Sequence, residues 1–119
     1  MTPPQPLPLL RGGAKKIRFI KLGSKLMENI LEKVYAIIKD RRANPKDGSY
    51  VNYLQKEGVD KICKKIGEES AEVIIAAKNN DKKELIYEIA DLYFHSLVLL
   101  EESNVTLEDI YNELQTRFK

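Results

Sequence analysis

Four carboxylates in two pairs are the residues of this sequence whose spacing best suits chemistry. Glu69 and Glu72 stand three positions apart, and so do Glu88 and Asp91. Residues three apart on an α-helix share one face, so each pair points in a single direction. Carboxylate oxygens without companion histidines suit a hard cation, so the two pairs predict a site for Mg²⁺, with Mn²⁺ as the second candidate.

The elements that carry the two pairs must also bring them together. Residues 59–79 and 81–102 are both predicted to be helical, and the short polar connection around Asn80 makes them antiparallel neighbours. Glu72 lies about nine residues before this turn and Asp91 about ten after it, so both pairs lie roughly 13–15 Å from the turn at 1.5 Å per residue. We therefore expect all four carboxylates to converge in one cleft.

Two alternatives compete with a magnesium site. Charged residues three apart are common on solvated helix faces, so one pair alone would carry little information. The second pair, however, lies inside a helix that is apolar on nearly every side, where an unpaired carboxylate is costly. A di-iron site would need two Glu-x-x-His motifs, whereas His95 is the only histidine and follows Asp91 by four positions. The spacing favours the magnesium site over both.

The remaining helices are predicted from apolar spacing and from capping residues. Apolar residues at three- and four-residue steps predict a first helix from about residue 24 to residue 42, stopped by the turn residues 44–48. Ser49 is expected to cap a short helix over residues 50–57, and Thr106 to cap a last one. We expect an all-α fold, an antiparallel helical bundle of about five helices.

Composition bounds the class of protein. The chain has 119 residues, of which 43% are hydrophobic and 32% charged, as is typical of one globular domain. Its apolar stretches are too short for a membrane span. The single Cys63 excludes an intramolecular disulfide framework and is expected to be a small buried apolar side chain. We expect a cytoplasmic protein whose partners include neither nucleic acid nor a membrane.

Residues 1–24 differ in composition from the rest of the chain. They include prolines at positions 3, 4, 6 and 8, and the chain up to residue 26 carries six basic residues and no acidic one. We interpret 1–24 as a flexible leader or an expression-derived extension, in which residues 17–22 form at most a short strand, and 25–119 as the folded domain. The charge also allows a nucleic-acid arm, but no aromatic residues are patterned with it.

Three segments resemble the phosphoribosyl-ATP pyrophosphohydrolase family. They are SYVNYL from Ser49, GVDKICKKIGEESAE from Gly58 and EIADLYFHSLVLL from Glu88. The resemblance covers about residues 27–119 and places the chain among the all-α nucleoside triphosphate pyrophosphohydrolases, alongside MazG-like and dimeric dUTPase-like enzymes. It implies Mg²⁺-dependent hydrolysis of phosphoribosyl-ATP to phosphoribosyl-AMP and pyrophosphate, the second step of histidine biosynthesis. The ExxE…ExxD pattern of the superfamily falls on the two carboxylate pairs.

This reaction needs metal ligands, a group that activates water, and cations for the phosphates. The metal-ligand candidates are Glu69, Glu72, Glu88 and Asp91. The catalytic candidates are Glu68, Glu69 and Glu72. Glu68 lies 100° around the helix from Glu69, where it is either the holder of the attacking water or a solvated charge.

The substrate-binding candidates are Lys65, Arg41, Ser49, Tyr50 and His95. Lys65 lies one turn before Glu69, so it either contacts phosphates or forms an i,i+4 ion pair. The resemblance implies substrate contacts for Arg41, Ser49 and Tyr50, for which the alternatives are a helix-dipole charge, a cap and a core residue. His95 contacts the substrate, bonds to Asp91 or fills the core.

The apolar helix also predicts self-association. Its neighbours have apolar faces of their own to bury, so Tyr87, Phe94 or Val98 should stay uncovered in a monomer, which indicates a homodimer or a dimer of dimers. The resemblance implies that the neighbouring subunit helps to complete the site. The chain is too short to hold the cyclohydrolase domain fused to this enzyme in many organisms, so a separate phosphoribosyl-AMP cyclohydrolase is expected downstream.

Two other functions stay open at this point. One is a house-cleaning nucleoside triphosphate pyrophosphatase of the MazG or dUTPase type, because the carboxylate pattern alone does not fix the substrate. The other is a helical dimerisation or regulatory module with vestigial carboxylates, which the intact pairs argue against.

Overall fold

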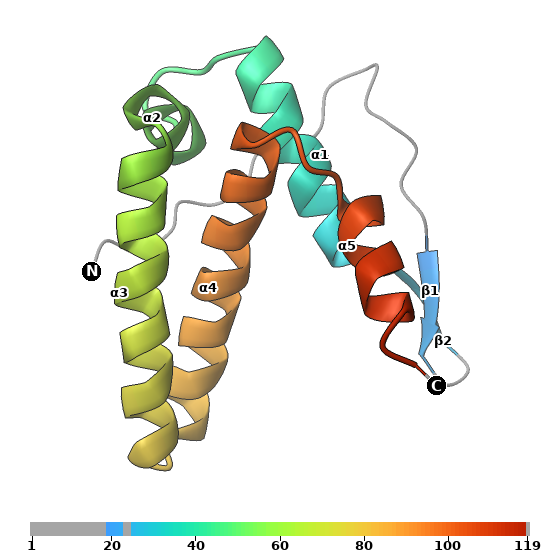
Figure 1. Ribbon diagram of the computed structural model, residues 1–119, viewed down its shortest axis with the longest axis vertical. Helices are drawn as coiled ribbons and strands as arrows, with labels where there is room; N and C mark the ends of the chain where they lie inside the picture. Colours follow the sequence, from blue (N-terminus) through green and yellow to red (C-terminus); the bar gives the residue numbers. More distant parts are fainter. Residues whose placement is uncertain (1–18, 23–24, 119) are drawn as a thin grey trace.

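The computed structural model of the protein describes residues 19–22 and 25–118, with side chains from Asn29 onward. In this part of the chain a two-stranded hairpin precedes five helices (Figure 1). The elements are β1 (Phe19–Leu22), β2 (Lys25–Glu28), α1 (Ile30–Ala43), α2 (Tyr50–Glu57), α3 (Val59–Lys78), α4 (Lys82–Glu102) and α5 (Leu107–Gln115). The predicted all-α class with about five helices is confirmed.

The start of the first helix differs from the prediction. The helix begins at Ile30 because Asn29 caps it, its side chain accepting a hydrogen bond from the Glu32 amide at 3.3 Å. The preceding residues form β2 instead, which pairs antiparallel with β1 so that Leu26 lies opposite Lys21. Leu26 therefore belongs to a strand, although its spacing fits the apolar repeat of α1. The short strand allowed within 17–22 is present; residues 1–18 of the predicted leader lie outside the described residues.

The helical hairpin of α3 and α4 forms as the sequence predicts. Gly58 adopts a φ of 87°, which ends α2 and lets α3 start at the next residue. At the other end, Asn80 turns the chain with a φ of 54°, and the Asp81 side chain then caps α4 by accepting from the Glu84 amide at 3.0 Å. α3 and α4 run antiparallel along their whole length (Figure 1).

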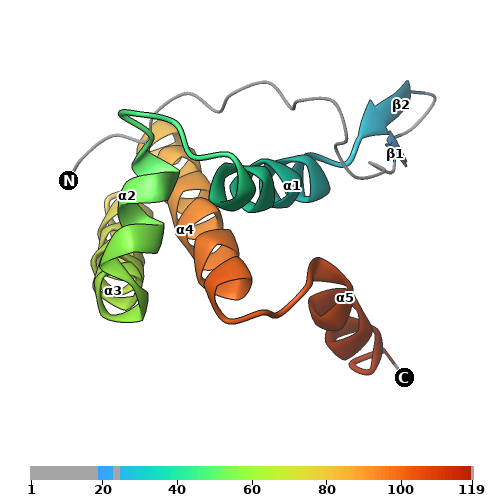
Figure 2. The same ribbon diagram turned by 90° about the horizontal axis from the view of Figure 1, so that it is seen from above.

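The core lies where α1, α2 and the second half of α4 meet. Its fully buried side chains include Ile38, Leu54, Ile62 and Val98. α5 lies on the opposite side of α4 from α3 (Figure 2). The Tyr35 hydroxyl of α1 fastens the loop that leads to α5 by donating to the Val105 carbonyl at 2.8 Å.

Coverage of α4 is partly as expected. Tyr87 is 38% exposed, as expected, and Phe94 is half-buried. Val98 is fully buried, so of the three named residues only the choice of Val98 was wrong. Val98 lies in the core with residues of α1 and α2, which cover this end of α4. Cys63 is exposed rather than buried, because it lies on the outer face of α3. Among the helices of the described residues, none combines the length and apolar composition that crossing a bilayer requires.

The end of α1 is joined to the end of α4 by an ion-pair network. Arg42 contacts both oxygens of Glu101, at 2.7 and 2.9 Å, and Glu102 at 2.6 Å. Gln55 of α2 donates to the same Glu101 carboxylate at 3.2 Å. Because Glu101 is buried, its charge depends on these partners.

We predict that Arg42→Ala lowers the free energy of unfolding by about 1–2 kcal/mol, because it leaves the buried Glu101 carboxylate with a neutral donor only. Urea denaturation measures the change. The control is Arg117→Ala, which breaks the exposed i,i+4 pair with Glu113 and should cost less than about 0.5 kcal/mol. Equal effects of the two substitutions would contradict the prediction.

Candidate metal centre

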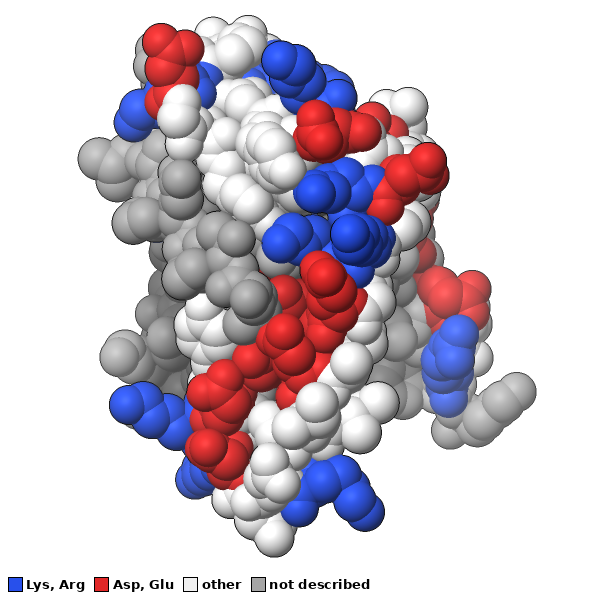
Figure 3. Space-filling model, turned by 90° about the vertical axis from the view of Figure 1, so that its left-hand side faces the viewer, with Lys and Arg blue, Asp and Glu red and all other residues white. Residues whose placement is uncertain are grey.

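The two carboxylate pairs meet between α3 and α4. Carboxylate oxygens of Glu69, Glu72 and Glu88 lie within 4.8 Å of one another. Potential ligand atoms of Glu69, Asp91 and His95 form a second group within the same distance. Glu69 is common to both groups and is fully buried, so it stands at the centre. The convergence expected from the helix spacing is thus present. Figure 3 shows acidic side chains gathered in one stripe, bordered at its upper end by basic side chains.

The carboxylate oxygens of this centre lack hydrogen-bond partners. Both oxygens of Glu69 and of Asp91, and one each of Glu72 and Glu88, are buried without a partner among the described residues. Buried polar groups normally have hydrogen-bond partners. Several buried carboxylate oxygens that lie close together without such partners therefore favour a bound cation. Oxygen donors of this number and charge fit Mg²⁺ or Mn²⁺.

Burial, followed by the neighbouring carboxyls, raises the pKa of two of these groups. The pKa of Glu69 rises well above its usual range, chiefly because the group is buried and then because Asp91 lies beside it. Burial also raises the pKa of Glu88, with Glu84 as the next cause. A cation would relieve both effects by replacing the protons that these groups otherwise hold.

Two of the substrate-binding candidates are bonded to each other rather than to solvent. The Tyr50 hydroxyl and His95 Nε2 are 2.8 Å apart, and His95 Nδ1 lies 2.9 Å from the carbonyl oxygen of Asp91. Burial, followed by the charges of Asp91 and Glu69, raises the pKa of Tyr50 to about 12. Of the three roles kept open for His95, the structure contains two: the ring is a buried core residue with both nitrogens bonded, and one of these bonds is to the main-chain carbonyl of Asp91. The substrate contact stays a prediction.

Glu68 and Lys65 flank the centre on α3. Glu68 is exposed, and its charge contributes to the raised pKa of Tyr50, so it lies near the mouth of the site. Lys65 is half-buried and forms no ion pair with Glu69, whose oxygens are unpartnered. The i,i+4 alternative for Lys65 is therefore absent, and its ammonium stays available for an anionic ligand. The catalytic role of Glu68 stays a prediction.

A pocket of about 540 Å³ opens beside α2. Ser49 and Tyr50 line it, as does Tyr53, whose ring stacks on Tyr50 at 6.0 Å. Lys46 and Lys56 add positive charge. The sequence analysis did not predict a role for Tyr53, Lys46 or Lys56. The turn before Ser49 was the available signal, because the first backbone amides of a helix that follows a turn are free to bind a ligand.

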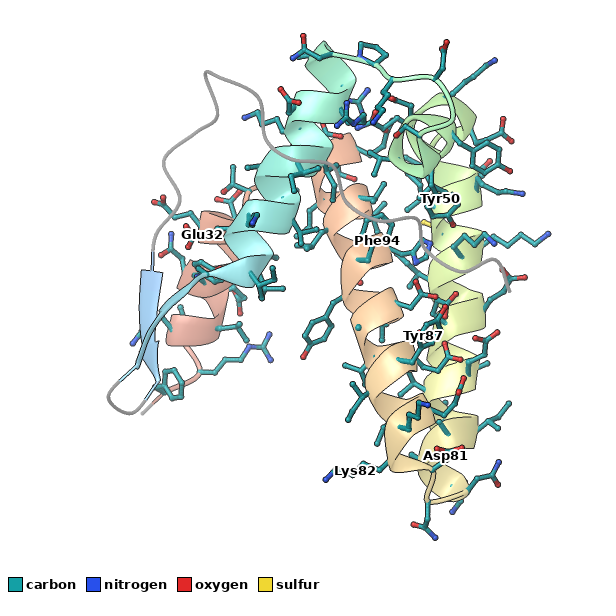
Figure 4. The ribbon with its side chains drawn as sticks, turned by 180° about the vertical axis from the view of Figure 1, so that it is seen from behind. Glu32, Tyr50, Asp81, Lys82, Tyr87 and Phe94 are labelled. Carbon is teal, nitrogen blue, oxygen red and sulfur yellow. The ribbon has the colours of Figure 1, made fainter. Side chains whose placement is uncertain are left out.

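Arg41 lies beneath this pocket rather than in its lining. Its side chain is buried and donates to the Asn44 carbonyl at 3.1 Å, while the Asn52 side chain donates to the Arg41 carbonyl at 2.8 Å. Arg41 thus holds the loop that carries the pocket. A direct substrate contact by Arg41 stays a prediction. Figure 4 shows Tyr50 of α2 and Phe94 of α4 on neighbouring helices beside the centre, and their rings stack at 6.1 Å.

Known proteins resemble this chain over the helical region. The family model described as phosphoribosyl-ATP pyrophosphohydrolase matches residues 31–118. A protein named phosphoribosyl-ATP pyrophosphatase from Clostridium acetobutylicum is 57% identical over 88 residues, which cover 74% of this chain and 80% of that protein. A protein of the same name from Clostridium novyi is 53% identical over 95 residues, covering 78% and 86% of the two chains.

Longer proteins match as well. The histidine biosynthesis bifunctional protein HisIE of Caldanaerobacter subterraneus subsp. tengcongensis is 58% identical over 90 residues, which cover 76% of this chain and 44% of that protein. The chain therefore spans less than half the length of this bifunctional relative.

The raised carboxyl pKa values predict how the metal-free protein responds to pH. Burial raises the pKa of Glu69 from 4.5 to about 9 and that of Glu88 to about 7, so from about pH 4.5 up to about pH 9 the folded state holds more protons than the unfolded state and stability falls as pH rises. The melting temperature of EDTA-treated protein should therefore decrease over this interval, and excess Mg²⁺ should restore it most at the alkaline end.

Thermal denaturation monitored by circular dichroism measures both effects. Glu69→Gln should flatten the pH dependence, whereas Glu113→Gln, at an exposed position of α5, should leave it unchanged. A melting temperature that rises with pH in the absence of metal would show that these carboxyls are not crowded as described.

Proposed function

Because the chain belongs to the phosphoribosyl-ATP pyrophosphohydrolase family, we propose that it hydrolyses phosphoribosyl-ATP to phosphoribosyl-AMP and pyrophosphate in the cytoplasm, as the second step of histidine biosynthesis. The observation that carries the proposal is a group of four carboxylates between α3 and α4, three of them buried and Glu72 half-buried, whose buried oxygens lack hydrogen-bond partners. A triphosphate is the kind of substrate that such a centre fits, because its oxygens complete the coordination of a hard cation.

In this proposal the protein holds the ion and orients the phosphates. Glu69, Glu72, Glu88 and Asp91 would hold Mg²⁺, which when bound supplies positive charge against the charge that builds on the triphosphate. Lys65 would bind the departing pyrophosphate, since its ammonium does not pair with Glu69. Glu68, exposed at the mouth of the site, would orient the water that attacks the α-phosphorus.

The pocket beside α2 suits the remainder of the substrate. Tyr50 belongs both to the pocket wall and to the hydrogen-bonded chain that reaches Asp91, so the pocket and the centre share a boundary. Tyr53 is 42% exposed there and offers a ring face on which a base can stack. Lys46, Lys56 and the hydroxyl of Ser49 line the same pocket as donors for phosphate or ribose oxygens.

We further propose that the working form is a homodimer or a dimer of dimers. Large apolar side chains of the α3–α4 hairpin stay exposed, to 62% for Ile74 and Ile86 and 54% for Tyr93. Apolar residues gathered on one hairpin support an interface. A separate phosphoribosyl-AMP cyclohydrolase would consume the product.

A nucleotide pyrophosphatase of the MazG or dUTPase type would use the same four carboxylates, so substrate choice is what separates the two functions. A panel of deoxynucleoside triphosphates tested beside phosphoribosyl-ATP makes the comparison. Preference for a deoxynucleotide would replace the proposed substrate. A protein that binds no divalent metal would instead support the regulatory module.

We predict that purified protein releases pyrophosphate from phosphoribosyl-ATP only when Mg²⁺ or Mn²⁺ is present. Glu72→Gln and Asp91→Asn should each lower turnover at least about 100-fold while the helical circular dichroism spectrum is kept, because each removes a ligand without adding a buried charge. Coupled pyrophosphate detection measures the rates. Activity that survives exhaustive EDTA treatment would refute the metal assignment. Near-normal turnover of both variants would show that the catalytic centre lies elsewhere.

The oligomer proposal predicts that the active species is larger than 13.7 kDa. Multi-angle light scattering at low micromolar concentration should give a dimer or tetramer, and Ile74→Asp with Ile86→Asp should shift the mass towards the monomer. As a control, Ile30→Asp changes an isoleucine that is 60% exposed outside this hairpin and should leave the mass unchanged. A fully active wild-type monomer would contradict the proposal.

A further inference from the structure

A hydrogen-bonded chain of three residues runs from the pocket wall to the metal centre. Tyr50 is the first residue of α2, and its hydroxyl lies 2.8 Å from His95 Nε2. The other ring nitrogen, His95 Nδ1, lies 2.9 Å from the Asp91 carbonyl oxygen and 3.5 Å from Asp91 Oδ1. All three residues are at least nine-tenths buried.

The acceptors in this chain fix where its protons lie. The Asp91 carbonyl can only accept, so His95 Nδ1 carries a hydrogen and donates. In the neutral imidazole the opposite nitrogen, Nε2, is then an acceptor, and the Tyr50 hydroxyl donates to it. The raised pKa of Tyr50, caused first by burial and then by the Asp91 charge, keeps that hydroxyl protonated.

Both polar ends of the imidazole are occupied, and its faces are covered. The Phe94 ring meets it edge-on with centroids 5.3 Å apart, and the Tyr50 ring does so at 5.7 Å. His95 is 1% exposed. A substrate atom would therefore have to displace Tyr50 or Asp91 to reach either nitrogen, so His95 is poorly placed for the substrate contact expected from the sequence.

The Asp91 carboxylate depends on this ring for its surroundings. Neither of its oxygens has a hydrogen-bond partner among the described residues, and His95 Nδ1 lies 3.5 Å from its Oδ1. A ring held at both ends limits the positions open to the Asp91 side chain beside it. Loss of the bond from Tyr50 would free the ring to tilt or to change tautomer.

We propose that Tyr50 and His95 are positioning residues that act through Asp91, and that together they set the affinity of the centre for its divalent cation. The inference rests on the proposed function for its catalytic consequence only, since metal affinity is measured without substrate. Partners that orient metal ligands in this way typically change metal affinity about 10–100-fold when they are removed.

The first test is Tyr50→Phe, which deletes a single oxygen. Calorimetric titration of metal-free full-length protein with Mn²⁺ should give a dissociation constant about tenfold higher than that of the unchanged chain. Tyr53→Phe is the matched control, because it makes the same change on the ring stacked against Tyr50 and should leave the Mn²⁺ constant unaltered. An unaltered constant in folded Tyr50→Phe would overturn the proposal, as would an original chain that binds no Mn²⁺.

Kinetics separate positioning from substrate contact. With Tyr50→Phe, the Mg²⁺ concentration that gives half-maximal activity should rise about tenfold, while KM for phosphoribosyl-ATP at saturating Mg²⁺ should stay within about twofold. A raised KM with unaltered Mn²⁺ binding would make Tyr50 a substrate contact and refute the inference. If no phosphoribosyl-ATP is cleaved at all, the proposed function fails, while the Mn²⁺ titration still decides the positioning role.

A double-mutant cycle tests whether the two residues act as one unit. Because Tyr50 acts through His95, adding Tyr50→Phe to His95→Leu should weaken Mn²⁺ binding no further than His95→Leu alone. Fully additive losses would show independent action and contradict the chain. His95→Leu alone leaves the buried Tyr50 hydroxyl without a hydrogen-bond acceptor and so can prevent folding. The double variant lacks that hydroxyl and avoids this problem. If neither variant folds, the Mn²⁺ titration of Tyr50→Phe alone still decides the proposal.

Discussion

Repulsion among three buried carboxylates and the half-buried Glu72 is the constraint on which this structure depends. Oxygens of Glu69, Glu72 and Glu88 approach within 4.8 Å, and Asp91 lies equally close to Glu69. At an effective dielectric constant of about 20, two unit charges at that distance repel by roughly 3 kcal/mol. Several such pairs together cost about as much as the whole stability of a small domain. The group therefore holds protons or a cation whenever the protein is folded, and the raised pKa values of Glu69 and Glu88 express the first of these states.

The α3–α4 hairpin explains how such a group can form. Its turn at Asn80 sets the two helices in register, and the Asp81 cap fixes where α4 begins. Because the two members of each pair are three residues apart, both face the partner helix, and the two pairs lie at about the same distance from the turn. The residues that surround the group limit how far each carboxylate can move. For Asp91, we propose that the hydrogen-bonded pair Tyr50–His95 sets this limit.

Most of the fold was predictable because its signals are local. Ser49 and Thr106 each cap a helix at the predicted residue, Asp81 caps the helix predicted over residues 81–102, and the carboxylate spacing follows from helix geometry alone. The start of α1 was not, because the apolar repeat extends back to Leu26 while the helix begins only after its N-cap, Asn29. The sequence also did not predict that Val98 is buried or that Arg42 pairs with Glu101. Both depend on how α1 packs across α4, and this long-range contact leaves no local pattern in the sequence.

The same distinction applies to the site. Residue types and spacing predicted the four carboxylates that the structure gathers, but three roles stayed open for His95 because sequence does not show which groups bond to its nitrogens. The centre itself lies at a boundary in the hairpin. Towards α1 and α2 the hairpin is covered, with Ile62 and Val98 fully buried, whereas towards its turn Ile74, Ile75 and Ile86 stay more than half exposed. A carboxylate group at this boundary has a covered side and an open side, and the low dielectric of the covered side would strengthen binding at the proposed cation site. In the proposed oligomer, a second chain over the exposed isoleucines would extend the covered side, so the two proposals imply coupling between oligomer formation and metal affinity.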